Sequence, residues 1–254
     1  LLLGCGGLMA GLLTLLRFLL GFVFVAVVST VFFVLALLLL PSRVWRIRLT
    51  NLYGKTVGPF ITWLAGVRPI IHHRERLNGS MPAIYVANHT STLDLFLCIW
   101  LCPFGGCGVI KKEIRGVPFF GWLAMLSGHL LLDRGNKERA VEALGRTAAF
   151  MRQHSLGAWM MPEGTRSKDG RLLPFKKGFV HLAIATGLPV VPVVLPGLHR
   201  TWQKGSMKLQ SMDCPIQVLP PIDTSGWREA SAAVHAEQVR QAIASCLPVE
   251  QRPV

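Results

Sequence analysis

Residues 86–94, V-A-N-H-T-S-T-L-D, follow an apolar run and contain a histidine and an aspartate five positions apart. The run 83–87 predicts a short buried strand, and the hydroxyl residues 90–92 are N-cap candidates for a following helix. On one regular helix, residues five apart lie about 140° from each other and could not meet. Across a strand-to-helix turn His89 and Asp94 can meet. The carboxylate would then fix the imidazole tautomer and leave the other nitrogen free to take a proton from a hydroxyl.

The same residues allow a simpler interpretation. Ser91 and Asp94 fit an S-x-x-[DE] capping box, in which Asp94 would only mark the start of a helix. His89 would then be an ordinary turn histidine. The spacing alone leaves both interpretations open.

Charge is distributed unevenly along the 254 residues. Hydrophobic residues make up 51% of the chain, and Arg17 is the single charged residue of positions 1–40. The net charge is +14, so the chain after position 40 carries a surplus of +13. A basic body behind an apolar leader indicates a surface held against anionic lipid, or a site for anionic substrates. Nucleic-acid binding is not expected, because zinc-finger spacing, RNP-like aromatics and basic heptads are all missing from the sequence.

The cysteines predict neither disulfides nor a metal site. No C-x-x-C pair and no accompanying His/Cys pair with zinc-site spacing occur in the sequence. We therefore expect buried thiols in a reducing compartment and no bound metal. The six cysteines are Cys5, Cys98, Cys102, Cys107, Cys214 and Cys246.

The N-terminal region predicts membrane attachment. Segment 18–40 has about 23 residues without a charge, enough to cross a bilayer of about 30 Å as a helix. Arg43, Arg46 and Arg48 follow directly, which by the positive-inside rule places the body of the protein on the cytoplasmic face. Segment 1–16 is a second apolar run that could form a second span, a re-entrant helix or an interfacial hairpin. The stretch is too long for a signal peptide, and because the first residue is Leu we expect further residues upstream.

The remaining chain alternates predicted strands and helices. Residues 44–64 mix aromatic and basic side chains, which is typical of a helix lying in the membrane interface. The expected fold class is α/β, a mixed, largely parallel sheet flanked by helices, with two parts: 1–66, membrane-embedded and interfacial, and 67–254, a catalytic domain. Further predicted strands are 69–77, 130–132, 158–161, 190–195 and 216–219, and predicted helices are 136–154, 174–186 and 227–245. Pro192 predicts that its strand lies at a sheet edge or beside a bulge.

Three polar groups follow predicted strands, where α/β sheets form their ligand crevice. They are His89 with Asp94, the pair 133–134, and residues 163–166. Together they supply a base, an orienting acid and fixed cations. This set suits acyl transfer from an activated donor to a hydroxyl of a phosphate-bearing acceptor.

Four motifs resemble the signature blocks of the glycerolipid acyltransferases. They are N-H-T-S-T-L-D (88–94), G-H-L-L-L-D-R (128–134), P-E-G-T-R-S (162–167) and V-V-P-V-V (190–194). The resemblance spans roughly 68–222 and is closest to the 1-acyl-glycerol-3-phosphate (lysophosphatidic acid) acyltransferases. It implies transfer of a fatty acyl group from acyl-CoA or acyl-carrier protein to the sn-2 hydroxyl of lysophosphatidic acid. The product would be phosphatidic acid, with no bound cofactor.

The resemblance also implies catalytic roles. His89 matches the general base, Asp94 matches the acid that orients it, and Lys111 falls where the family carries a lysine near the developing oxyanion. A neighbouring lysine at 112 makes the last assignment less specific. No G-x-S-x-G motif is present, so we expect no covalent acyl-enzyme.

Substrate-binding roles follow in the same way. The residues matching the phosphate-binding blocks are Arg134, Glu163, Gly164, Thr165 and Arg166, and Pro192 matches a wall of the acyl site. Because a carboxylate is a poor phosphate ligand, Glu163 could instead brace Arg166 or a backbone turn. Two other functions remain open, acylation of a different lyso-lipid and an inactive membrane-binding scaffold.

Overall fold

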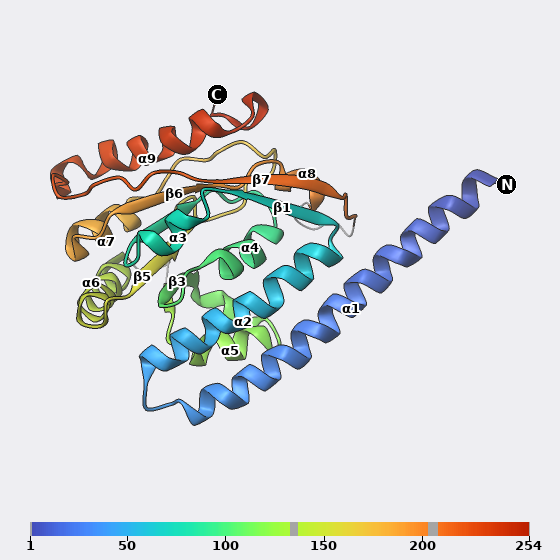
Figure 1. Cartoon of the computed structure of the whole chain (residues 1–254), viewed down its shortest axis with the longest axis horizontal. Coiled ribbons are helices and arrows are strands. Elements are labelled where there is room, and N and C mark those ends of the chain that lie inside the picture. The colour runs from blue at the N-terminus through green and yellow to red at the C-terminus, as the bar shows by residue number, and fades with distance from the viewer. Residues whose placement is uncertain (1, 133–136, 203–207, 254) are drawn as a thin grey trace.

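The computed structural model describes residues 2–132, 137–202 and 208–253, and within them a seven-stranded sheet is flanked by helices on both faces (Figure 1). The strand order is β1-β7-β6-β2-β5-β3-β4. Neighbouring strands run parallel apart from the β6–β7 pair, which confirms the predicted α/β class with a mixed, largely parallel sheet. The strands are β1 Val67–His72, β2 Ile84–Ala87, β3 Gly106–Lys111, β4 Leu130–Leu132, β5 Gly157–Met160, β6 Val190–Val194 and β7 Met212–Val218.

Alternation along the central strands divides the core into two layers. In β2, Tyr85 and Ala87 face a cluster shared with α2 and α4, whereas Ile84 and Val86 face a cluster shared with α6, α7 and α9. The helices are α1 Leu2–Leu38, α2 Arg43–Leu64, α3 Glu75–Gly79, α4 Leu93–Leu101, α5 Phe120–Leu126, α6 Lys137–His154, α7 Gly178–Thr186, α8 Leu198–Thr201 and α9 Ala232–Cys246. Short 3-10 turns occupy Lys112–Gly116, Glu229–Ser231 and Val249–Gln251.

The two N-terminal apolar runs form one continuous helix, α1, so the chain does not turn back between them as a hairpin would require. No proline or polar turn separates them, and the helical hydrogen bonds therefore continue through Arg17. The segment Gly11–Leu38 is long and apolar enough to cross a membrane, a test that buried core helices and signal sequences also pass. One side of this helix packs on the body, and the other exposes large apolar side chains such as Leu12, Leu16 and Val27.

Helix α2 packs on the body through one side, and its expected position in a membrane interface stays a prediction. Ile47, Val57 and Ile61 on one side of the helix are buried. At Gly58 an added Cβ would lie 2.6 Å from the carbonyl oxygen of Phe96, so this glycine lets α2 approach α4 closely. The small and apolar residues of α2 thus form a packing stripe.

Two further expectations change in detail. The strand predicted over 69–77 ends at His72, and the chain turns at His73, where φ is +59°, before α3 begins. The strand that contains Pro192 is not at a sheet edge, because β6 lies between β7 and β2. A register shift beside it places residues 219–221 opposite residues 191–192, so a bulge accommodates the proline.

Candidate functional site

The turn after β2 is held in place by a side chain that the sequence did not single out. Asn88 donates from Nδ2 to the Leu195 carbonyl at 2.9 Å, and its Oδ1 accepts the Leu195 N–H at 2.8 Å. This two-way bond joins the carboxyl ends of β2 and β6. Asn88 is fully buried, and its place directly after an apolar strand was the available signal.

His89 and Asp94 meet across this turn. The Nδ1 atom of His89 lies 3.0 Å from Oδ2 of Asp94, which is completely buried, whereas 18% of the His89 side chain is exposed. Facing a carboxylate, Nδ1 is assigned the proton, so Nε2 carries the lone pair. Among the described residues, no side chain or backbone group bonds Nε2.

Asp94 also organises the backbone that carries His89. Its Oδ2 accepts the N–H of Thr90 and, at 2.7 Å, the N–H of Ser91. Half of the predicted capping box is therefore present. The other half is replaced, because Ser91 Oγ accepts the Leu93 N–H at 3.2 Å and donates to the Trp202 carbonyl at 2.9 Å. One carboxylate thus both caps the turn and contacts the imidazole. The helix-start role and the orienting role predicted for Asp94 therefore do not exclude each other.

Glu163 braces the same turn from the neighbouring strand. Its Oε1 accepts the His89 N–H at 2.5 Å and its Oε2 accepts the Leu173 N–H at 3.0 Å. The side chain is 3% exposed, and this burial raises the pKa of Glu163 to about 8. Both carboxyl oxygens are engaged with backbone, which favours the bracing role over the predicted phosphate contact.

Arg166 belongs to the segment after β5, and its side chain reaches Thr92, the residue before α4. Its Nη1 donates to Thr92 Oγ1, and the Ser167 N–H donates to the His89 carbonyl at 3.1 Å. Gly164 takes a φ of +76°, a conformation that favours glycine, and turns the chain so that Thr165 is exposed. The structure therefore brings His89, Asp94 and the 163–166 segment together, as the sequence predicted.

The other predicted site residues are placed less fully. Arg134 lies outside the described residues. Lys111 is the last residue of β3, and its side chain is not among the described ones, so its proposed oxyanion role stays a prediction. Strand alternation puts Pro192 on the same face as Val190 and Val194, toward α7 and α9.

A narrow cavity of about 80 Å³ lies between α2, α4, α5 and the opposite face of the sheet. Its wall is largely apolar, with Leu123, Trp159 and Met161 among the lining residues. Met161 is two positions before Glu163 in the chain, so the cavity lies close to the catalytic turn. Pro192 does not line this cavity, and its expected role as a wall of the acyl site stays a prediction.

His129 forms the polar end of this cavity. Its Nδ1 accepts the Gly108 N–H at 3.1 Å, so Nε2 donates to Thr50 Oγ1 at 3.0 Å. Burial lowers the pKa of His129 to about 4, and the ring is therefore neutral near pH 7. This histidine is a satisfied polar group.

A family model described as Acyltransferase matches residues 68–196, the region that carries all of these groups. The chain belongs to the acyltransferase family. A 1-acyl-sn-glycerol-3-phosphate acyltransferase of Limnanthes douglasii is 38% identical over 92% of this chain and 82% of its own length. The alpha form of the Homo sapiens enzyme with the same name is 30% identical, over 72% of this chain and 65% of its own length.

The solved structure of a 1-acyl-sn-glycerophosphate (LPA) acyltransferase from Thermotoga maritima has the same fold. It aligns with a TM-score of 0.74 and 23% identity, covering 94% of this chain and 97% of its own. This acyltransferase therefore shares its fold with that protein over nearly all of its length.

Proposed function

We propose that this acyltransferase transfers a fatty acyl group from an acyl thioester to the sn-2 hydroxyl of lysophosphatidic acid, giving phosphatidic acid. The observation that carries the proposal is the 3.0 Å contact between His89 Nδ1 and the buried Asp94 carboxylate, with Arg166 beside the same turn. The names of the relatives supply the substrate class.

His89 acts as the general base. Its Nε2 takes the proton from the sn-2 hydroxyl while the hydroxyl oxygen forms a new C–O bond to the thioester carbonyl carbon. The C–S bond then breaks, and the leaving thiolate recovers the proton from His89. Asp94 stabilises the transient imidazolium and keeps its orientation, and no acyl-enzyme forms.

Arg166 holds the phosphate of the acceptor. A planar guanidinium can grip a phosphate through two hydrogen bonds, and it stays charged at every physiological pH. Its present partner, Thr92, is a neutral hydroxyl that a phosphate can displace or share. The donor is acyl-CoA or acyl-carrier protein, and its chain enters the cavity beside Trp159 and Met161.

Helix α1 attaches the enzyme to an anionic membrane, with the catalytic body on the cytoplasmic face. Its exposed apolar side supports this, as does the basic sequence that follows it. Two arginines of this basic sequence also attach α2 to the body. Arg43 Nε donates to the Gly128 carbonyl at 2.8 Å, and Arg46 Nε donates to the Leu126 carbonyl at 2.7 Å.

Turnover by the purified protein tests the proposal. We expect phosphatidic acid from lysophosphatidic acid with one acyl thioester, and less product from lysophospholipids with larger headgroups. His89→Ala should lower kcat by about 10²-fold to 10⁴-fold while vesicle binding is retained. Absence of turnover with lysophosphatidic acid would instead favour another lyso-lipid acceptor or an inactive scaffold. An unchanged rate in His89→Ala would refute the role of His89 as general base.

A further inference from the structure

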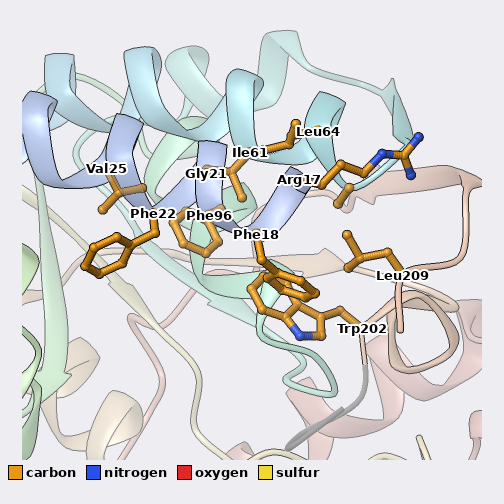
Figure 2. Close-up of a pocket in the computed structure, with 11 residues that line it drawn as sticks. Arg17, Phe18, Gly21, Phe22, Val25, Ile61, Leu64, Phe96, Trp202 and Leu209 are labelled. Atoms are coloured by element: carbon orange, nitrogen blue, oxygen red, sulfur yellow. The ribbon is translucent and has the colours of Figure 1, made fainter. Parts of the chain in front are cut away.

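A second cavity, separate from the one beside Trp159, lies between α1, the end of α2 and the start of α4 (Figure 2). Its volume is about 250 Å³, near the lower end of the range for small-molecule sites. All of its lining side chains are apolar except one, Arg17. Figure 2 shows the Arg17 side chain at one end of the cavity, with its guanidinium directed away from the Phe18, Phe96 and Trp202 rings.

The walls of this cavity are set by close packing between the helices. At Gly21 an added Cβ would lie 3.1 Å from Leu64 Cδ2, so the glycine brings α1 against α2. The Phe18 ring meets the Trp202 ring edge-on, with centroids 5.1 Å apart. These aromatic side chains form a defined apolar slot, not a loose gap between helices.

Arg17 is out of place in a helix that is otherwise free of charge. It is the one charged residue of positions 1–40, and no residue in the described part of the chain forms an ion pair with it. Arg17 is half-buried, and a charged side chain beside an apolar surface is costly unless water or a polar partner meets it. A cation at the end of an apolar slot complements an amphiphile with one chain and an anionic headgroup.

The cavity is connected to the catalytic turn through its inner wall. Phe96, which lines the cavity, follows Asp94 by two positions on α4. Trp202 also lines it, and its carbonyl accepts the Ser91 hydroxyl at 2.9 Å. A lipid in the slot would therefore lie against the back of the turn that carries His89.

We propose that this cavity holds the acyl chain of the lyso-lipid acceptor, with the acceptor's phosphate at Arg17, before the lipid moves to His89. This inference rests on the proposed function, because it takes the acceptor to be lysophosphatidic acid. The single cation and the apolar lining fit one phosphate and part of one chain. The site would load the acceptor from the membrane side, where α1 exposes its apolar face.

Photo-crosslinking locates the lipid directly. The full-length protein, in neutral phosphatidylcholine vesicles without acyl donor, is exposed to lysophosphatidic acid carrying a photoreactive group near the chain terminus. We expect crosslinks to residues that line the cavity, suppressed by excess lysophosphatidic acid but not by two-chain phosphatidylglycerol. Crosslinks elsewhere would overturn the proposal. Equal suppression by phosphatidylglycerol would also overturn it, since the cavity would then hold a bulk lipid.

Paired variants test the cavity by kinetics. Val25→Phe fills the slot, whereas Val23→Phe adds the same ring at a position that is 47% exposed. We expect Val25→Phe to raise KM for lysophosphatidic acid about tenfold, equivalent to about two buried methylene groups, with the donor KM unchanged. The Val23 variant should match wild type. Equal behaviour of both variants would contradict the proposal, while a wild type inactive on lysophosphatidic acid would refute the proposed function first.

The charge is tested by moving it. Arg17→Leu should raise the acceptor KM about tenfold, since it removes a charged hydrogen-bond donor to phosphate. Adding Leu16→Arg to that variant restores the helix charge on the exposed side, where Leu16 is 57% exposed. We expect no recovery of KM in the double variant. Full recovery would show that Arg17 attracts anionic lipid generally, and the site would be refuted.

Discussion

Replacing the buried carboxyl of Glu163 by an amide should change how the stability of the protein depends on pH. Burial raises the pKa of Glu163 from 4.5 to about 8, so folding favours the protonated form. The stability that this group contributes is fully present below about pH 4.5 and is lost as the pH rises through about 8. Glutamine does not ionise, and the Glu163→Gln variant should not show this loss.

The size of the effect follows from the two pKa values. Between 4.5 and about 8, at about 1.4 kcal/mol per pH unit, the difference amounts to about 5 kcal/mol at most. For a protein of this size, 1 kcal/mol moves Tm by roughly 2–4 °C. Between pH 5 and pH 9 the difference comes to about 4 kcal/mol, so relative to wild type the Tm of Glu163→Gln should rise by about 8–16 °C.

Thermal unfolding in detergent at pH 5, 7 and 9 measures this difference. Glu142→Gln is the matched control, because Glu142 is exposed on α6 and its removal should leave the pH dependence unchanged. Other titrating groups contribute equally to wild type and variant and cancel in the comparison. If the Tm curves of wild type and Glu163→Gln stay parallel from pH 5 to pH 9, the argument from burial is wrong.

Three further predictions concern catalysis and substrate choice. Asp94→Asn should lower kcat by about 10²-fold or more with little change in KM, because the amide cannot stabilise the imidazolium. Asp213→Asn, at an exposed position, is its control, and equal rates in both variants would contradict the role of Asp94. Arg166→Gln should raise the acceptor KM about tenfold and Arg166→Lys less, measured at fixed acyl donor, and a larger effect on the donor KM would argue against phosphate binding. Gly108 lines the cavity beside Trp159, and a Cβ there would lie 3.7 Å from the His129 ring. Gly108→Val should therefore narrow the cavity and shift the preference toward shorter acyl donors in a chain-length series. An unchanged preference would place the donor chain elsewhere.

The pairing of His89 with Asp94 was predictable because it depends on local geometry. A short strand, a turn and a helix start bring residues five apart into contact, and the sequence encodes all three. The position of Glu163 depends on β5 lying beside β2. The alternation of strands and helices predicts a largely parallel sheet, but it does not predict which strands are neighbours. Its bond to the His89 backbone could not be read from spacing, because the two residues are 74 positions apart in the chain.

Contacts between segments distant in the chain explain what the sequence left open. The pattern over 44–64 indicated an interfacial helix, and it could not show that α2 also packs on α4. Pro192 was expected at a sheet edge or beside a bulge because proline lacks an N–H, and the second alternative is confirmed by the bulge opposite residues 191–192. Asn88 went unnoticed since its partner, Leu195, is distant in sequence.

The hydroxyl of Tyr53 on α2 lies 2.9 Å from the Ser29 hydroxyl on α1, and the rings of Phe24 and Phe60 stack at 3.9 Å between the same two helices. Removing α1 to improve solubility would therefore expose the apolar surface of α2 that α1 covers, and would remove part of the hydrophobic core. Such a shortened protein should aggregate or lose activity even in the presence of detergent. Preparations meant for crystallography or screening should keep the first helix and supply amphiphile to shield it.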